Sequence, residues 1–164
     1  MISNTAQYTT DWEFLNQKLI FPDDELDYQL EKVLTYQKEH NNTRKNKKGI
    51  HGMIVLDDLN IMANRQSQYL SQIYTLGRHF LLTVILISQY AKHVVNSCVR
   101  GNIDYLFFSE LTLNSIQALY DCVFCDMTIK QFKKFIDDNN HDYQFILYNN
   151  KTQNKVDRFK IVKA

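Results

Sequence analysis

The chain has 164 residues, 45% of them hydrophobic and 23% charged, a composition typical of a folded domain rather than a disordered segment. Its net charge of +1 does not favour a nucleic-acid or membrane partner, so such a partner has to be argued from local patches. The longest apolar run is too short to cross a bilayer, no signal-peptide pattern follows Met1, and the odd number of cysteines, three, indicates reduced thiols. We therefore expect one intracellular domain over residues 1–164, neither secreted nor membrane-bound.

The chain opens with a short strand end at residues 1–5 and a helical turn or two at 11–19. A helix is predicted next, because Pro22 and the acidic residues after it form a helix-start signal. Four residues then recur at helical spacing and give one apolar face: Leu26, Leu30, Val33 and Leu34. A basic loop at 41–49 ends this helix, and we favour a solvated loop over one that contacts DNA phosphates. Its charges are Arg44, Lys45, Lys47 and Lys48.

Two uninterrupted apolar runs follow, at residues 53–56 and 81–87, and predict two strands. Strands that are apolar throughout are covered on both faces, as in parallel sheets. The segment between them, residues 61–76, is predicted to be a helix. Its inward-facing candidates are Ile61, Tyr69, Ile73 and Leu76.

The second half predicts a third strand at 104–108, helices at 113–124 and 128–137, and two late strands at 143–148 and 156–162. Strands separated by helix-length crossovers favour an open α/β sheet. We therefore predict a three-layer α/β fold of the RecA-like type with a largely parallel central sheet, which the late strands extend at an edge. In such sheets ligands bind beyond the carboxyl ends of the strands.

Polar residues stand where both central strands end. Asp57 and Asp58 follow the first apolar run, and Ser88 and Gln89 follow the second. In nucleotide hydrolases one carboxylate at such a place helps to hold Mg²⁺ and a second orients the attacking water. A glutamine amide can donate to a γ-phosphate oxygen while it accepts from that water. The alternative is that an aspartate only caps the helix that begins near Ile61.

Two arginines are candidates for a residue that acts across a subunit interface. Arg78 is expected at a helix end just before the second strand, from which an exposed guanidinium can reach a neighbour's phosphate. The alternative is a helix C-cap, with Gly77 and a cation that offsets the helix dipole. Arg100 is the second candidate.

The order of these segments resembles the poxvirus-type DNA-packaging ATPases of the FtsK–HerA superfamily of P-loop proteins. The segments that carry the resemblance are IVLDDL, LGRHFLLTVILISQY and VRGNIDYLFF, and the opening Ile2–Gln7 is similar to the core strand that follows the phosphate loop in that family. The resemblance implies an ATP hydrolase with ATP and Mg²⁺ as cofactors, a ring-shaped homo-oligomer, and double-stranded DNA as partner. It also implies a location in the infected cell or the virion.

By this resemblance Asp57 belongs to the acidic Walker B strand and binds magnesium through water, while Asp58 acts on the attacking water. Gln89 senses the γ-phosphate, and Arg78 is the finger that acts in trans. Each role is an expectation.

The chain departs from the family in one respect. It contains no Gly-x-x-x-x-Gly-Lys-Ser/Thr loop and no Gly-Lys pair, and that loop supplies the main-chain donors and the lysine that hold the phosphates. We therefore expect an N-terminally incomplete core that binds nucleotide weakly by itself. The other interpretations are a motor for DNA segregation or recombination, a non-catalytic remnant or interaction module, and a different metal-dependent α/β hydrolase that uses Asp57 and Asp58.

The sequence also contains one Cys-x-x-Cys spacing, at Cys122 and Cys125. A structural zinc site needs four ligands, and neither Cys98 nor the scattered histidines supply a second pair. We therefore do not predict a zinc site.

Overall fold

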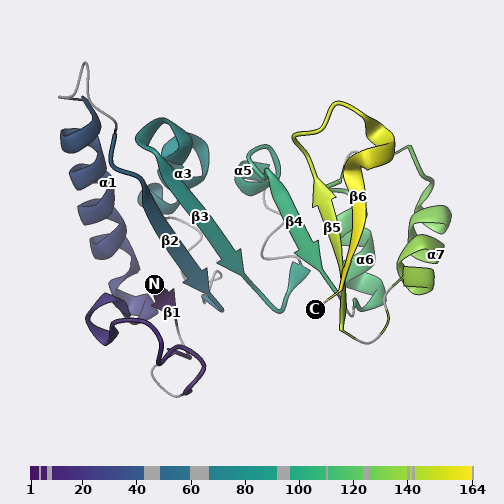
Figure 1. The fold of residues 1–164 in the computed structure, drawn as a ribbon, viewed down its shortest axis with the longest axis horizontal. Coiled ribbons are helices and arrows are strands. Elements are labelled where there is room, and N and C mark those ends of the chain that lie inside the picture. The colour runs from purple at the N-terminus through teal and green to yellow at the C-terminus, as the bar shows by residue number, and fades with distance from the viewer. Residues whose placement is uncertain are drawn as a thin grey trace. The chain divides into compact units, whose positions relative to one another are not determined.

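The computed structural model describes residues 1–3, 5–6, 9–42, 49–59, 67–91, 97–109, 111–123, 126–139, 141 and 143–163, without the side chains of residues 42, 97, 98, 155 and 156. The chain, which we predicted to form one domain, divides into two compact units, Met1–Gln89 (unit 1) and Tyr90–Ala164 (unit 2). Their elements are labelled in Figure 1. The basic run at 44–48, Ile61 and Cys125 lie outside the described residues.

Unit 1 contains a three-stranded parallel sheet in the order β1-β2-β3 (Figure 1). The strands are β1 (Ile2–Ser3), β2 (Gly52–Asp57) and β3 (Leu82–Ile87), so both strands predicted from the apolar runs are confirmed, with β2 in the centre of the sheet and β3 at its edge. On the outer side of β1, Phe21 forms a parallel bridge with Ile2, and its carbonyl accepts a 3.1 Å hydrogen bond from the amide of Ser3. One edge of the sheet is thereby continued by the chain itself.

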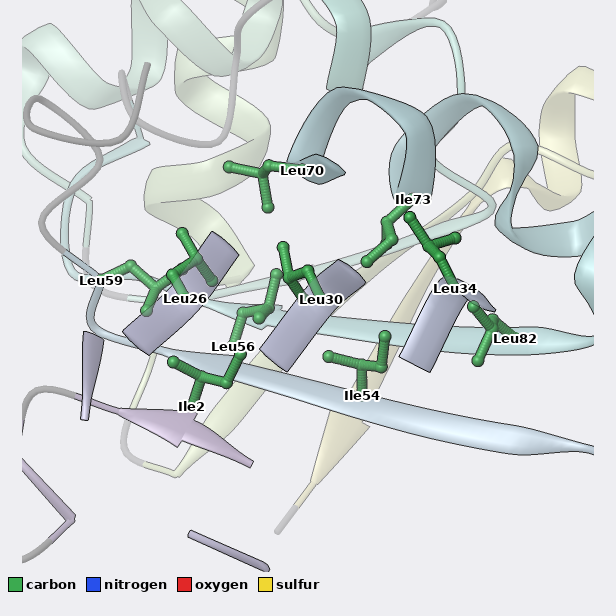
Figure 2. Packing of buried hydrophobic residues seen from close by; sticks show 10 residues of the cluster. All are labelled: Ile2, Leu26, Leu30, Leu34, Ile54, Leu56, Leu59, Leu70, Ile73 and Leu82. Carbon is green, nitrogen blue, oxygen red and sulfur yellow. The ribbon is translucent and has the colours of Figure 1, made fainter. Parts of the chain in front are cut away.

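Two helices cover one face of this sheet, α1 (Leu26–Asn42) and α3 (Gln68–Leu76). The Ser67 hydroxyl accepts a 3.0 Å hydrogen bond from the amide of Leu70, and this N-cap starts α3. Figure 2 shows the apolar side chains of α1 and α3 pointing toward those of the strands. This core contains Ile2, Leu26, Leu30, Leu34, Ile54, Leu56, Leu59, Leu70, Ile73 and Leu82.

Short 3-10 helices complete unit 1: η2 (Gln17–Leu19), η3 (Asp23–Glu25) and η4 (Gly77–Phe80). The helix that we predicted up to Leu76 does end there, but Leu76 is 40% exposed and its assignment as inward-facing was wrong. A left-handed residue, Leu81 (φ 56°), turns the chain from η4 into β3.

The opposite face of the sheet differs from our expectation that both faces would be covered. Met53, Ile85 and Ile87 lie on this second face and are 66%, 42% and 40% exposed. In the register of the sheet Asp57 pairs with Ile87, so it belongs to the same face. The unbroken apolar sequence of the strands therefore produces one packed face and one exposed apolar face in unit 1.

Unit 2 is built around an antiparallel sheet in the order β4-β5-β6. Phe132, Ile136 and Ile146 are its most buried side chains, and they pack the helices against the sheet. The prediction that the late strands extend the parallel sheet was wrong, as was the inclusion of the third strand in that sheet, because β4 and β6 both pair antiparallel with β5 in a separate sheet. The elements are α5 (Ser97–Arg100), β4 (Tyr105–Phe108), α6 (Leu113–Tyr120), α7 (Ile129–Asn139), β5 (Gln144–Asn149), η5 (Lys155–Arg158) and β6 (Phe159–Lys163).

The protein is thus a mixed α/β protein with a parallel three-stranded sheet. Within the described ranges, every helix is too short or too polar to span a bilayer.

Candidate functional site at the carboxyl ends of β2 and β3

The site lies where the adjacent parallel strands β2 and β3 of unit 1 end. Asp57 is in register with Ile87, and the amide of Asp58 donates a 3.1 Å hydrogen bond to the Ile87 carbonyl, which continues the ladder by one residue. The Gln89 side-chain amide, Nε2, then lies 3.5 Å from Oδ2 of Asp58 and donates to it. The structure therefore brings the predicted carboxylates and the predicted glutamine together, on adjacent strands.

A third residue, Ser3, completes this cluster. Its hydroxyl donates a 2.8 Å hydrogen bond to Oδ2 of Asp57, and its oxygen accepts from the amides of Ala6 (3.0 Å) and Thr5 (3.2 Å). Asp57 is only 8% exposed, and a carboxylate with so little access to water needs such a donor. Sequence reasoning missed Ser3. The only signal for Ser3 in the sequence was its position in the predicted strand end at residues 1–5.

The two adjacent carboxylates have different surroundings because of the backbone at Asp58. Asp58 has φ 46°, a left-handed conformation that aspartate tolerates better than most residues. This conformation ends the strand at Asp57. One carboxylate is therefore buried against Ser3, while the other is half-buried and faces the exposed Gln89. The alternative role, a cap of a helix near Ile61, falls on residues 60–66, outside the described part of the chain.

The donors in this cluster are of the kind that Mg²⁺ prefers. They are two carboxylates, and Mg²⁺ is commonly held by one or two carboxylates together with waters and substrate phosphates. Across the described residues there is no group of three or more His, Cys, Asp or Glu side chains that could enclose a metal ion. The cluster thus fits a magnesium ion that also takes ligands from water and phosphate, and it does not form a complete metal cage.

Arg78 lies at the other end of β3. It is exposed and belongs to η4, just before β3 begins. Because β3 has six residues, its length separates Arg78 from Gln89 by roughly 20 Å. The structure therefore does not bring Arg78 to the carboxylates of its own chain.

Arg100 has a different environment, inside unit 2. Its guanidinium lies close enough to the thiol of Cys122 to affect that thiol's pKa, and its Nε atom is buried and has no hydrogen-bond partner among the described residues. Burial raises the pKa of the Cys122 thiol, and the neighbouring Arg100 charge acts in the opposite direction. Arg100 thus lies beside Cys122 within its own unit.

Comparison with solved structures shows a similar fold in viral packaging proteins. The genome packaging NTPase B204 from Sulfolobus turreted icosahedral virus 2, in complex with AMPPCP, matches with a TM-score of 0.58 at 16% identity, over 99% of this chain and 80% of that chain. The DNA-packaging ATPase B204 from Sulfolobus turreted icosahedral virus matches with a TM-score of 0.57 at 13% identity, over the same fractions. The virus 2 protein with ATP-gammaS gives a TM-score of 0.56 at 14% identity.

At identities this low, the structural matches show a shared fold only. The family follows instead from a match of the sequence to a family model. Comparison with curated proteins gave no match. The family model for the Poxvirus A32 protein, however, matches residues 16–156, which include β2, β3 and most of unit 2. The poxvirus-type resemblance seen in the sequence is thereby confirmed, and the chain belongs to the Poxvirus A32 protein family.

Proposed function

We propose that this chain is the metal- and γ-phosphate-sensing part of an ATP-driven DNA-packaging motor of a virus or virus-like element, with double-stranded DNA as its partner. The observation that carries the proposal is the cluster of Asp57, Asp58 and Gln89 at the ends of two adjacent parallel strands. Membership of the Poxvirus A32 family and the fold shared with viral packaging NTPases support it. The FtsK–HerA relationship and the RecA-like three-layer core belong to the same proposal.

The residues take distinct roles in this proposal. Asp57, oriented by Ser3, holds Mg²⁺ through water, and the ion when bound would neutralise charge on the ATP phosphates. Asp58, half-buried rather than enclosed, orients the attacking water and receives its proton. Gln89 hydrogen-bonds to Asp58 in this structure, and we propose that it exchanges this bond for one to the γ-phosphate.

Arg78 acts on the nucleotide of the next subunit in a ring of copies. Its charge stabilises a transition state only where negative charge accumulates, and the length of β3 separates it from the carboxylates of its own chain. The proposal therefore requires that several copies of the chain assemble into an oligomer. We place this oligomer in the infected cell or the virion.

The rivals are a non-catalytic interaction module, a DNA segregation or recombination motor, and a different metal-dependent hydrolase. Supplying a phosphate-binding loop experimentally distinguishes an ATPase from the non-catalytic module and from the different metal-dependent hydrolase. The 164-residue chain alone should hydrolyse no ATP above an Asp58→Asn control, because no Gly-Lys loop is present in it.

The test is to fuse a designed strand–Gly-x-x-x-x-Gly-Lys-Thr–helix segment to the N-terminus through a Gly/Ser linker and to measure phosphate release with and without double-stranded DNA. The proposal expects Mg²⁺-dependent ATP turnover that DNA stimulates and that Asp58→Asn abolishes. Folded, nucleotide-binding fusion protein that releases no phosphate would favour the non-catalytic module. Turnover that survives in Asp58→Asn would contradict the assigned role of this residue.

A further inference from the structure

The connection between β1 and η3, drawn in purple near β1 in Figure 1, exposes apolar side chains although its backbone is held in place. Phe14 is 76% exposed and Leu19 59%, and the Phe14 ring lies beside that of Trp12, with 5.9 Å between the ring centroids. The amide of Leu15 donates a 3.0 Å hydrogen bond to the Trp12 carbonyl, and that of Leu19 a 2.8 Å bond to the Asn16 carbonyl. An ordered segment that presents apolar side chains to solvent indicates an interaction surface.

The same stretch of chain is strongly acidic. Residues 9–28 contain six acidic side chains and one basic side chain, a net charge of −5 in a chain whose net charge is +1. None of the six forms an ion pair with a described residue. Such a surface repels nucleic-acid phosphates and favours a basic partner. We call it the acidic–apolar surface, made of Phe14 and Leu19 together with Asp11, Glu13, Asp23, Asp24, Glu25 and Asp27.

Helix α1 separates this surface from the other end of the sheet. Figure 2 shows Leu26, the first residue of α1, beside Leu56 near the carboxyl end of β2. The helix then runs for 17 residues, which is about 25 Å. At its far end the Asn41 side chain accepts a 3.0 Å hydrogen bond from the amide of Ile50 and donates a 3.2 Å bond to the carbonyl of Phe80. The two ends of α1 therefore lie at opposite ends of β2.

The basic run at 44–48 belongs to that far end. Four of its five residues are Lys or Arg. It follows Asn42, where α1 ends, and precedes Ile50, which is bonded to Asn41. A segment from Asn42 to Gly49 that leaves and returns to one place can reach no more than about 13 Å from it, and α1 is about twice as long. The run therefore cannot reach the start of α1 in its own chain, and these two opposite charges meet only through a second copy.

We propose that the acidic–apolar surface binds the basic run 44–48 of a second copy of this chain. The basic groups pair with the carboxylates, while their aliphatic stems and an arginine plane pack on Phe14 and Leu19. Because two different surfaces meet, the contact is heterologous, and successive copies add head to tail. The family model matches residues 16–156, so Trp12 and Phe14 stand outside the part of the chain that it matches. The inference rests on the proposed function only for the use of the oligomer.

The test measures self-association of the full chain by sedimentation equilibrium, without nucleotide, metal or DNA. Raising the salt from about 50 to about 300 mM should weaken association by roughly tenfold or more, because ion pairs at a surface are screened. Phe14→Ser should weaken it by about tenfold or more, since an exposed aromatic anchor is lost. Tyr143→Ser is the matched control, at an aromatic residue of unit 2 that is 84% exposed, and it should leave association unchanged.

Charge reversal tests the other half of the contact. Lys45→Glu combined with Lys47→Glu should abolish association, because the run then repels the acidic–apolar surface. Lys130→Glu combined with Lys133→Glu, at two exposed lysines of α7, is the control for the same change in net charge and should have no effect.

A mixture of the Phe14→Ser chain and the Lys45→Glu, Lys47→Glu chain distinguishes the head-to-tail contact from a symmetric one. Each variant is expected to stay monomeric by itself, and the mixture should form dimers with one chain of each kind and nothing larger. The reason is that only one pairing joins an intact acidic–apolar surface to an intact basic run.

Association that neither variant weakens, or a wild-type chain that stays monomeric up to about 1 mM, would overturn the inference. So would a salt-insensitive association that Phe14→Ser removes and the lysine substitutions do not, which would identify a symmetric apolar contact between copies. Head-to-tail association of a chain whose loop-fused form never turns over ATP would uphold this contact and count against the motor. Monomers here, together with turnover in the loop-fused protein, would do the reverse.

Discussion

The Ser3 hydroxyl donates a 2.8 Å hydrogen bond to the carboxylate of Asp57, across a pair of residues that are 54 positions apart in the chain. Both side chains are buried, Ser3 at 2% and Asp57 at 8% exposure. The contact fixes the orientation of the carboxylate that we assign to magnesium, and it depends on the parallel pairing of Ser3 with Asp57.

Removing this hydroxyl should destabilise unit 1. Ser3→Ala leaves the buried carboxylate and two main-chain amides without their partner, and we expect a loss of about 1–3 kcal/mol in the free energy of unfolding. Urea unfolding measures it, with Thr10→Ala as the control at an exposed hydroxyl, expected within about 0.5 kcal/mol of the wild type. In a double-mutant cycle with Asp57→Asn, the loss of unfolding free energy in the double mutant should be smaller than the sum of the losses in the two single mutants. Strict additivity would show that the two residues are not coupled.

Because the backbone at Asp58 is left-handed, we expect two substitutions at this position to differ in their effect on stability. Asp58→Asn should fold with nearly unchanged stability because asparagine tolerates positive φ, whereas Asp58→Ile should lose about 1–2 kcal/mol because its β-branched side chain does not. Urea unfolding of the two variants measures the difference. Equal stability would mean that the residue does not keep φ 46° in solution.

The carboxylate cluster should bind a divalent metal weakly in the isolated chain. With Mn²⁺ as a paramagnetic substitute for Mg²⁺, amide signals of Asp58 and Gln89 should broaden first in a nitrogen–proton NMR spectrum. Asp57→Asn should weaken this effect by roughly tenfold or more, since even changes around metal ligands cost 10- to 100-fold. Asp121→Asn, an exposed aspartate in unit 2, should leave it unchanged. Broadening centred elsewhere would remove Asp57 as the ligand.

Arg78→Ala should abolish turnover in the loop-fused protein while nucleotide binding and folding remain. Arginine fingers contribute on the order of a thousandfold or more in rate, whereas a cation near a helix end contributes about 0.3–1 kcal/mol to stability and nothing to turnover. Mixing Arg78→Ala subunits with Asp58→Asn subunits should restore part of the activity, because some interfaces then join an intact carboxylate pair to an intact arginine. Inactivity at every ratio would contradict action in trans.

The thiol of Cys122 should titrate above the ordinary cysteine value of 9.0, because burial raises its pKa. The rate of alkylation by iodoacetamide against pH measures this in a Cys98→Ser, Cys125→Ser background. Arg100→Gln should move the midpoint further upward, since the guanidinium charge favours the thiolate. Lys130→Gln, an exposed charge on α7, should have no effect. A midpoint that falls on removal of Arg100 would contradict the contact.

The sequence by itself determined the two parallel strands and which polar residues stand at their ends. The apolar runs before Asp57 and Ser88 indicated two parallel strands, and the polar residues that follow them indicated a candidate site because ligands bind at strand ends. Asp58 and Gln89 could therefore be paired without a structure. The family resemblance was visible for the same reason, since it rests on the order of local motifs.

Only the tertiary structure decided what depends on pairing between distant segments. The sequence cannot show that Ser3 is the donor to Asp57, because that contact follows from the register of β1 against β2. Nor does apolar character distinguish β4, which pairs antiparallel with β5, from a strand of the parallel sheet. Met53 and Ile85 look like core residues in the sequence, yet they are exposed, because burial is set by which elements are present to cover a face and not by the hydrophobicity of the residue alone.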